Sequence, residues 1–344
     1  MRLIIFPEIP GVRNGSQIAV ASDIARFANL EQDCVVCYSD HMVGGKDYLY
    51  LRRMRHERFR HVLNLLRSRP ASEVFAYELD SVIPLGRESF GEIFCGETIF
   101  YRALRYLFPE VHLHVRFHNF YSFAKYRQDQ RRFPSTFRMS YLLNKMTELE
   151  SEILRDKNVS PIFITEEELS FARLAFPSLG GVCWPVVPPL ILTGPIKPPS
   201  KLRLVHFGSA SAAHTEVGLR FFCSVIFPRI IKDLPGIEFH LFGNGSKSFT
   251  APSKGIYGHG IFQDDSFPFN GEALFIVPDL FGCGIKLKIH DLLRAQVPFI
   301  TTPFGISGYK IEGNENILIC DVDDWHENII NYFSRFAFYA NKST

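Results

Sequence analysis

The sequence predicts two α/β domains, each built around a parallel sheet. The chain has 344 residues, enough for about two hydrophobic cores of ordinary size. Short apolar runs alternate with stretches of helical periodicity in both halves, which is the order typical of β-α-β units. Between the halves, residues 184–199 contain six prolines, and proline at that density interrupts helices and central strands. We therefore expect two Rossmann-like halves joined by a semi-rigid linker.

We place the domain boundaries around this proline-rich segment. The first domain is expected to span residues 1–185, and the linker residues 186–200. The second domain is expected to span residues 201–325, followed by a C-terminal helix at 326–344 that can cross back to the first domain. Ligands of open α/β sheets bind at the carboxyl ends of the strands, so both domains should present loops to a common cleft.

In the first half, short apolar runs predict strands at residues 3–6, 34–39, 74–79, 92–96, 111–117 and 160–165. Amphipathic periodicity predicts helices at residues 16–30 and 136–156. Thr165 is followed by three glutamates, which is typical of a helix N-cap with an acidic first turn.

The second half repeats the alternation of strand and helix. Strands are expected at residues 201–208, 237–243, 273–278, 298–303 and 316–321. Helices are expected at residues 214–233, 285–296 and 323–338.

Composition excludes several classes of protein. Apolar residues make up 46% and charged residues 22%, which is typical of a soluble globular chain. A formal charge of +2 gives no overall attraction to nucleic acid. No run of about 18 uncharged apolar residues is present to span a membrane. The first apolar run stops at Pro7 without a cleavage site, so the seven scattered cysteines are expected to be reduced thiols in the cytoplasm.

The most specific motif lies at residues 277–305, where a strand, a glycine loop and a helix follow one another. Gly282 and Gly284 allow a tight turn and close approach of the backbone to a ligand. Lys286 and Lys288 add positive charge at the expected helix N-terminus, which predicts a site for a diphosphate. Asp291, one turn later, is a candidate for ribose hydroxyls. The alternative is a solvated amphipathic helix with a glycine entry.

This motif resembles the carboxy-terminal signature of GT-B glycosyltransferases, particularly glycosyltransferase family 4. Segments 205–230, 237–245 and 257–267 resemble the first strand with its phosphate-side loop, the second strand, and the base-side strand of the same family. RFHNF at 116–120 resembles its frequent His-Asn motif. The resemblance implies a GT-B fold, with two Rossmann-like domains facing each other across a cleft. It also implies sugar transfer from a nucleotide sugar with retained configuration and no obligatory metal.

The resemblance implies a set of site residues on each side of the cleft. On the donor side these are Gly208, Ser209, His259, Gly282, Cys283, Gly284, Ile285, Lys286, Lys288 and Asp291. On the acceptor side they are Gly11, Arg13, Gly15, Arg116 and Asn119. His118 and Lys286 are expected to be catalytic, with His118 near the reacting sugar and Lys286 stabilising the leaving diphosphate. Alternatively, His118 is an ordinary satisfied histidine and residues 7–16 form only a tight connection.

Three departures from the family pattern shape this prediction. Cys283 stands where the family often has an acidic residue, and Asp291 replaces the usual glutamate. The loop after the strand 201–208 contains no lysine or arginine, although many members have both there. Phosphate binding is therefore expected to depend on Lys286, Lys288 and backbone amides.

A basic segment at residues 51–69 holds seven arginines against one glutamate on a largely helical pattern. Such a surface fits anionic lipid, although a solvated charged face is the alternative. The expected membrane contacts are Arg52, Arg53, Arg55, Arg58 and Arg60.

Together these patterns predict a cytoplasmic glycosyltransferase, peripheral at the inner face of the plasma membrane, in cell-surface polysaccharide or glycolipid biosynthesis. Its partners would be a nucleotide-sugar donor and a saccharide or lipid-diphosphate-linked acceptor, with no cofactor, metal or nucleic acid. Two alternatives stay open: an epimerase-like enzyme that processes nucleotide sugars, and a catalytically silent GT-B binding or scaffold protein. A dehydrogenase is disfavoured because no G-x-G-x-x-G follows the first strand.

Overall fold

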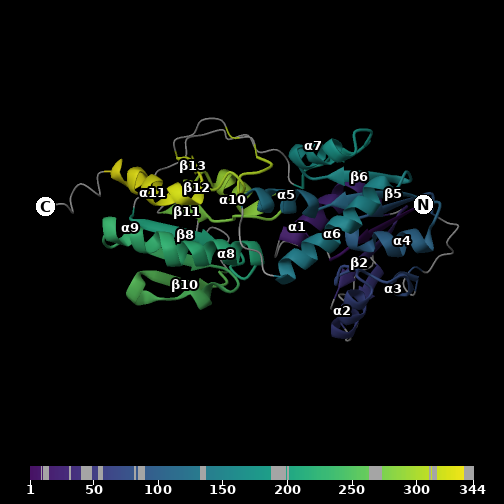
Figure 1. Ribbon diagram of the computed structural model, residues 1–344, viewed down its shortest axis with the longest axis horizontal. Coiled ribbons are helices and arrows are strands. Elements are labelled where there is room, and N and C mark those ends of the chain that lie inside the picture. The colour runs from purple at the N-terminus through teal and green to yellow at the C-terminus, as the bar shows by residue number, and fades with distance from the viewer. Residues whose placement is uncertain are drawn as a thin grey trace. The chain divides into compact units, whose positions relative to one another are not determined.

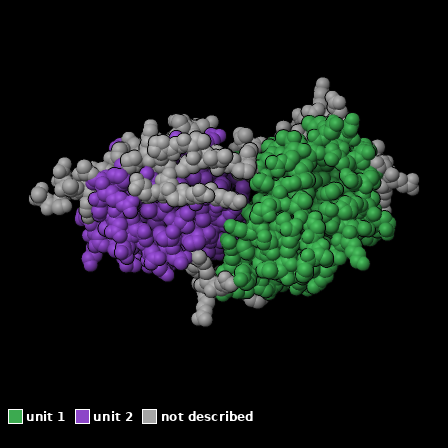
Figure 2. All heavy atoms as spheres, turned by 90° about the horizontal axis from the view of Figure 1, so that it is seen from above, with its two compact units in different colours: residues 1–188 green, residues 189–344 purple. Residues whose placement is uncertain are grey.

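The computed structural model describes most of the chain. The described residues are 1–336 without 9, 11–14, 31, 40–48, 53–56, 81–82, 84–89, 132–136, 187–198, 200, 263–272, 310 and 312–315. The chain divides into two compact units, residues 1–188 and 189–344 (Figure 2). Each unit has one sheet with helices packed on it, and all described strand pairs within the two sheets are parallel (Figure 1). The division falls at Pro188, within the proline-rich segment.

The first unit contains a seven-stranded sheet in the order β3-β2-β1-β4-β5-β6-β7. Its strands are β1 (Arg2–Phe6), β2 (Cys34–Ser39), β3 (Leu49–Arg52), β4 (Glu92–Cys95), β5 (His112–Phe117), β6 (Val159–Phe163) and β7 (Val182–Cys183). The order reverses at β1, which is the arrangement of a doubly wound sheet. Along β1, Leu3 and Ile5 belong to one core cluster, whereas Ile4 and Phe6 belong to another, so both faces of the sheet are buried.

Helices cover both faces of this sheet. They are α1 (Gly15–Phe27), α2 (Glu57–Leu66), α3 (Ala76–Asp80), α4 (Tyr101–Leu107), α5 (Tyr121–Arg131), α6 (Phe137–Arg155) and α7 (Glu166–Ala175), with a 3-10 turn at Thr98–Phe100. Val20 and Ile24 of α1 pack with Ile4, whereas Leu104 of α4 and Leu149 of α6 pack in the opposite cluster. The N-cap expected at Thr165 is confirmed, because its Oγ1 accepts the N–H of Glu168 at 3.1 Å.

One expectation for the first unit was wrong. Residues 74–79 contribute to helix α3 instead of forming a strand. Phe75, Glu78 and Leu79 are buried while Tyr77 is 59% exposed, and this spacing follows the helical period instead of alternating.

The largely helical pattern of the segment 51–69 is confirmed over α2, which begins at Glu57. The first two residues of the segment close strand β3.

The second unit contains a six-stranded sheet in the order β10-β9-β8-β11-β12-β13. Its strands are β8 (Arg203–Phe207), β9 (Glu238–Phe242), β10 (Ile256–Gly260), β11 (Leu274–Val277), β12 (Phe299–Thr301) and β13 (Ile317–Ile319). Its helices are α8 (Ala213–Phe221), a π-helical segment (Phe222–Ile226), α9 (Phe227–Asp233), α10 (Leu287–Ala295) and α11 (Trp325–Ser334), with 3-10 turns at Ser246–Phe249, Pro252–Lys254 and Val322–Asp324. The expected alternation of strand and helix is therefore confirmed for this half.

The C-terminal helix α11 packs within the second unit. Trp325 is fully buried, and its ring centroid lies 5.9 Å from that of Phe222. Trp325–Ser334 belongs to the second unit, because its large aromatic residues complete that unit's core. The expectation that the C-terminal segment crosses back to the first domain stays a prediction. Residues 337–344 lie outside the described residues. Of the helices in the described part of the chain, none has the length and apolar character needed to cross a membrane.

Helix α8 lies against the end of β11 at a glycine. A Cβ added to Gly218 would lie 1.7 Å from the carbonyl oxygen of Pro278, which is closer than any real side chain can approach. The absence of a side chain at Gly218 therefore sets the distance between α8 and the loop that follows β11.

We expect Gly218→Ala to lower the free energy of unfolding by about 2 kcal/mol, because α8 must move away from the backbone of Pro278. In an unobstructed helix the same substitution stabilises by about 1 kcal/mol, so the sign of the effect is diagnostic. Urea unfolding measures it. Gly91→Ala serves as the control, since an added Cβ there meets nothing within 4 Å. A Gly218→Ala variant at least as stable as the parent would contradict this packing.

Candidate functional site

The donor-side residues gather at the carboxyl edge of the second unit's sheet. The strand order reverses between β8 and β11, and the loops that follow these two strands carry Gly208 and the glycine motif. Ligands of open parallel sheets bind at this type of switch point, because the two loops diverge there.

The loops after β8 and β9 contact each other through their backbones. Gly208 and Gly243 both have positive φ, at +106° and +117°, which favours glycine. A Cβ on Gly243 would lie 2.0 Å from the carbonyl oxygen of Gly208, and the N–H of Ala210 donates to the oxygen of Asn244 at 2.8 Å. The loop after β8 therefore packs directly against the backbone of the loop after β9.

Lys288 binds a fully buried carboxylate at the end of β11. Its Nζ lies 3.0 Å from Oδ2 of Asp279 and 3.3 Å from Oγ1 of Thr215, and Thr215 donates to the other oxygen of Asp279 at 3.1 Å. Lys288 also lies beneath the loop after β8, because a Cβ on Gly208 would be 3.9 Å from its Cε. The structure thus brings Gly208 and Lys288 together, with the Lys288 ammonium already paired to Asp279.

Lys286 lies at the N-terminus of α10 and is held from several sides. Its Nζ donates to the carbonyl of Cys283 at 2.9 Å and lies 4.7 Å from the ring centroid of Phe304. The hydroxyl of Tyr309 donates to the backbone oxygen of Lys286 at 3.0 Å. The turn before it depends on Gly282 and Gly284, whose φ angles are +122° and +70°. Its ammonium is therefore pre-positioned inside the glycine loop where a helix begins.

The other predicted donor-side residues spread over the same edge. Ser209 is exposed, whereas Cys283 and Ile285 are half-buried in the glycine loop. Asp291 is exposed on α10, and the surrounding protein raises the pKa of its carboxyl by removing part of its hydration, while nearby His290 and Arg294 lower it. His259 lies on β10, two strands from β8, and its ring stacks on Phe242 at 4.4 Å.

His206 is a buried histidine beneath this site. Its Nδ1 lies 3.0 Å from the carbonyl oxygen of Ile276, and within the described part of the chain its Nε2 has no hydrogen-bond partner. Burial, followed by the charge of Lys288, lowers the pKa of His206 to about 3. The imidazole is therefore neutral at physiological pH.

In the first unit, His118 follows β5 and lies beside a buried ion pair. Asp23 of α1 is 1% exposed, and its carboxylate contacts the fully buried guanidinium of Arg116 at 3.2 Å. Nε2 of His118 lies 3.3 Å from Oδ2 of the same carboxylate. Because Arg116 is fully buried, it is not available for the direct acceptor contact expected of it.

The remaining acceptor-side residues are only partly described. Asn119 is half-buried directly after His118, and Gly15 is the first residue of α1. Gly11 and Arg13 lie outside the described residues. In the basic segment, Arg53 and Arg55 also lie outside them, as do the side chains of Arg52, Arg58 and Arg60.

Sequence reasoning missed acidic residues beside the predicted residues of each unit, namely Asp279 in the second unit and Glu97 and Asp23 in the first. Asp279 follows a strand-ending proline, and Glu97 follows the glycine after β4, so both stand at carboxyl ends of parallel strands. Because ligands of parallel sheets bind at the carboxyl ends of the strands, this position in the sequence could have identified both residues as candidates. Burial raises the pKa of Glu97, and the charge of nearby His118 lowers it. Asp23 gave no such signal, because a buried acid on a helix is indistinguishable from an exposed one in the sequence.

Glu150 of α6 caps helix α5 immediately after the His118 loop. Its carboxylate accepts the N–H of Tyr121 at 2.6 Å and the N–H of Ser122 at 2.7 Å. These two N–H groups begin the helix and have no partner within it, so the cap fixes where α5 starts. The position of the loop that carries His118 follows from this cap.

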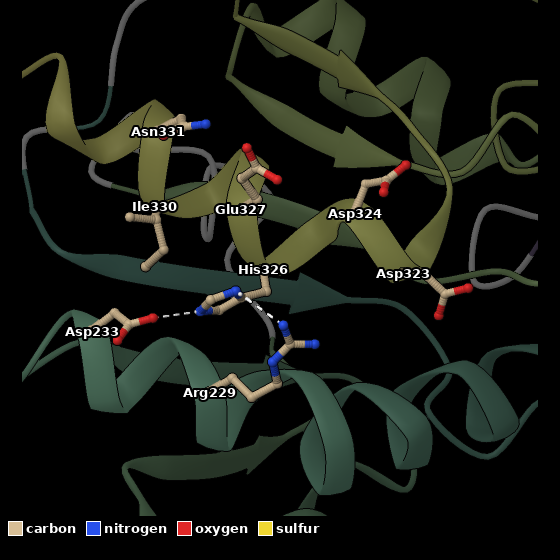
Figure 3. A pocket seen from close by; sticks show the side chains of 8 residues that line it. All are labelled: Arg229, Asp233, Asp323, Asp324, His326, Glu327, Ile330 and Asn331. Carbon is tan, nitrogen blue, oxygen red and sulfur yellow. Dashed lines mark hydrogen bonds and ion pairs between the residues drawn. The ribbon is translucent and has the colours of Figure 1, made fainter.

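A pocket of about 380 Å³ lies away from the predicted residues, between α9 and α11 (Figure 3). His326 bridges its two sides, with Nε2 2.7 Å from Oδ2 of Asp233 and Nδ1 3.5 Å from Arg229. None of the predicted site residues lines it. Over the described ranges of the chain, no three His, Cys, Asp or Glu side chains are grouped to hold a metal ion.

Comparison with known sequences gives limited information. The chain matches no protein-family model. An uncharacterized 44.6 kDa protein in the cps region of Klebsiella pneumoniae is 27% identical over 127 residues, which is 33% of this chain and 33% of that protein. The chain therefore covers a third of the length of this curated relative.

Comparison with solved structures identifies the fold. WaaG, a glycosyltransferase involved in lipopolysaccharide biosynthesis, aligns over 99% of this chain and 97% of its own, with a TM-score of 0.56 and 11% identity. A trehalose-6-phosphate structure from E. coli, bound with UDP-2-fluoro glucose, aligns over 100% and 92%, with a TM-score of 0.58 and 11% identity. TarM aligns over 74% of this chain and 50% of its own, with a TM-score of 0.52 and 13% identity. The fold is that of GT-B glycosyltransferases, as expected.

We expect Lys288→Met to lower the free energy of unfolding by about 3 kcal/mol, because it leaves the buried carboxylate of Asp279 without its cation. Adding Asp279→Asn should recover part of that loss, since the unpaired charge is then removed. Urea unfolding of both variants measures the effect, with the exposed Lys254→Met as control. Equal stability of the Lys288 and Lys254 variants would show that the ion pair does not support the fold.

We expect stability to fall by about 2 kcal/mol between pH 7 and pH 5 because of His206. The unfolded chain takes up a proton below the ordinary pKa of 6.5, whereas the folded chain does so only near pH 3. The contribution is therefore fully present above pH 6.5 and is lost as the pH falls. His206→Asn should flatten this part of the pH dependence, and the half-exposed His290→Gln should not. An unchanged slope in His206→Asn would contradict the assignment.

Proposed function

We propose that this chain is a glycosyltransferase that moves a sugar from a nucleotide-diphosphate sugar to a saccharide or lipid-linked acceptor. The reaction proceeds with retention and without an obligatory metal, in cell-surface polysaccharide or glycolipid biosynthesis. The observation that carries this proposal is Lys286, held in a glycine loop at the N-terminus of α10 and at the switch point of the second sheet.

The chemistry of sugar transfer agrees with these residues. Cleavage of the sugar–phosphate bond builds negative charge on the leaving diphosphate, which needs a fixed positive partner. Lys286 supplies a cation, and the N-terminus of α10 supplies backbone N–H groups and the positive end of its dipole. Since the Lys288 ammonium is paired with Asp279, we assign the diphosphate contact chiefly to Lys286.

The similar proteins support the same class of donor and context. One of the similar structures holds UDP-2-fluoro glucose, and WaaG is described as taking part in lipopolysaccharide biosynthesis. The matching Klebsiella protein is described only by its location in the cps region. Uridine nucleotides are therefore the first donors to test.

We assign the acceptor to the first unit, at the carboxyl end of β5. His118 and Asn119 leave the strand there, and α5 starts immediately afterwards under the cap of Glu150. His118 is the catalytic residue of this side. Its side chain is 12% exposed, so a small part of the ring is open to a ligand.

We also propose that α2 brings the protein to an anionic membrane at the inner face of the plasma membrane. Val62, Leu65 and Leu66 of this helix are 51%, 46% and 77% exposed. Exposed apolar side chains on a helix that also carries arginines favour the lipid interface, where both kinds of group are satisfied. The protein would then bind a lipid-linked acceptor at the surface of the membrane that contains it.

Two alternative functions can be distinguished from sugar transfer by the products that they form. An epimerase-like enzyme converts a nucleotide sugar into its isomer without any acceptor. A scaffold protein with this fold releases no nucleoside diphosphate. The absence of lysine and arginine from the loop after β8 is the observation that favours the scaffold.

We expect one nucleotide of a panel of nucleoside diphosphates and nucleotide sugars to raise the melting temperature selectively, by mass action on the folded state. Lys286→Met should abolish that shift and lower the rate of transfer by about 10²–10³-fold, because it removes the charge opposite the leaving group. Lys254→Met, an exposed lysine of the same unit, is the matched control. Full activity in Lys286→Met would remove the diphosphate assignment. No shift with any nucleotide would favour the scaffold.

A further inference from the structure

Asp23 lies between Arg116 and His118, and all three side chains come from elements of the first unit. Nε of Arg116 donates to Oδ2 of Asp23 at 3.2 Å, and Nη2 lies 3.2 Å from Oδ1. The Nε2 atom of His118 lies 3.3 Å from Oδ2 on the same carboxylate. The guanidinium thus faces both carboxylate oxygens, and the imidazole adds a third contact.

Neither Arg116 nor α1 can easily move away from this position. Nη1 of Arg116 donates to the carbonyl of Trp184 at 2.6 Å, which fixes the guanidinium from the side opposite Asp23. The hydroxyl of Ser22 donates to the carbonyl of Val186 at 2.6 Å, which fastens α1 to the same segment. Asp23 is therefore held in a fixed position towards His118.

His118 needs this carboxylate as a hydrogen-bond acceptor. Its Nε2 is buried and, within the described part of the chain, has no aligned hydrogen bond. A buried N–H without a partner is destabilising, so a small rotation of the ring that directs an Nε2 proton towards Oδ2 is favourable. Asp23 is the carboxylate with a measured contact to this nitrogen, whereas Glu97, also near His118, accepts the N–H and hydroxyl of Thr98 through Oε1 at 3.2 and 3.3 Å.

We propose that Asp23 is a positioning residue that holds His118 with its proton on Nε2. Nδ1 then keeps its lone pair and accepts a hydrogen bond from a hydroxyl of a saccharide acceptor. A carboxylate that fixes the tautomer of a histidine acts through orientation and charge, not by contacting the substrate itself. The assignment of this hydroxyl to an acceptor rests on the proposed function, whereas the tautomer does not.

The test is Asp23→Leu, which removes the acceptor and keeps the approximate size of the side chain. Asparagine is not suitable, because Nε of Arg116 and Nε2 of His118 both face Oδ2, and an amide oxygen placed there would still accept from both. Without the carboxylate, Nε2 of His118 loses its acceptor, so the proton should move to Nδ1. Ring ¹⁵N chemical shifts of the full chain, with the His118 signals assigned by their loss in His118→Gln, report the tautomer directly.

The matched control is Asp33→Leu. Asp33 is likewise buried, with a side chain 3% exposed, and pairs with Arg2 at 2.6 Å in the same unit. We expect the His118 tautomer to change in Asp23→Leu and to remain unchanged in Asp33→Leu. In the transfer assay, kcat should fall about 10²-fold in Asp23→Leu with the donor KM unchanged, since the donor does not bind to this residue.

Two results would overturn the proposal. One is an unchanged His118 tautomer in a folded Asp23→Leu variant. The other is a parent protein whose His118 carries its proton on Nδ1, and this measurement needs no variant to fold. A parent protein without transfer activity would instead count against the proposed function, because the tautomer is measured without turnover.

Discussion

One buried carboxylate, Asp279, connects four elements around the donor side of the molecule. Its side chain binds Thr215 of α8 and Lys288 of α10, and its backbone oxygen accepts the hydroxyl of Thr302 after β12. An unpaired charge in this fully buried position would be costly, so each partner is fixed by the need to satisfy it. The glycine loop with Lys286 lies between Asp279 and α10, and its shape follows from this connection.

The first unit also contains a buried ion pair, but there the central charge is a cation. There a buried cation, Arg116, is surrounded by the carboxylate of Asp23 and the carbonyl of Trp184. In both units the buried pair lies close to the carboxyl end of the parallel sheet, beside the residues proposed to meet substrate. A residue proposed to meet substrate can then face the ligand on one side, while the buried ion pair fixes its position from the other side.

Much of the fold followed from local patterns, whereas the site followed only in part. The apolar run at 34–39 coincides with β2, because β-branched residues between polar ends specify a buried strand. The run at 74–79 was wrongly predicted as a strand, because its apolar residues fit both the strand period and the helix period. Only tertiary packing favours the helix there. The glycines and Lys286 were recognisable since their roles are local. The pairing of Lys288 with Asp279 was not, because it depends on which charges the sheet buries.

The contact between Gly208 and Gly243 limits how the proposed donor site can diversify. A side chain at Gly243 would collide with the backbone of Gly208, and one at Gly208 would be strained by its φ of +106°. In the proposed site, variation in sugar or base preference would therefore come from residues whose side chains are exposed beside these loops, such as Ser209 or His259. Attempts to redesign donor preference would gain most from libraries confined to such positions, with the glycine framework left constant.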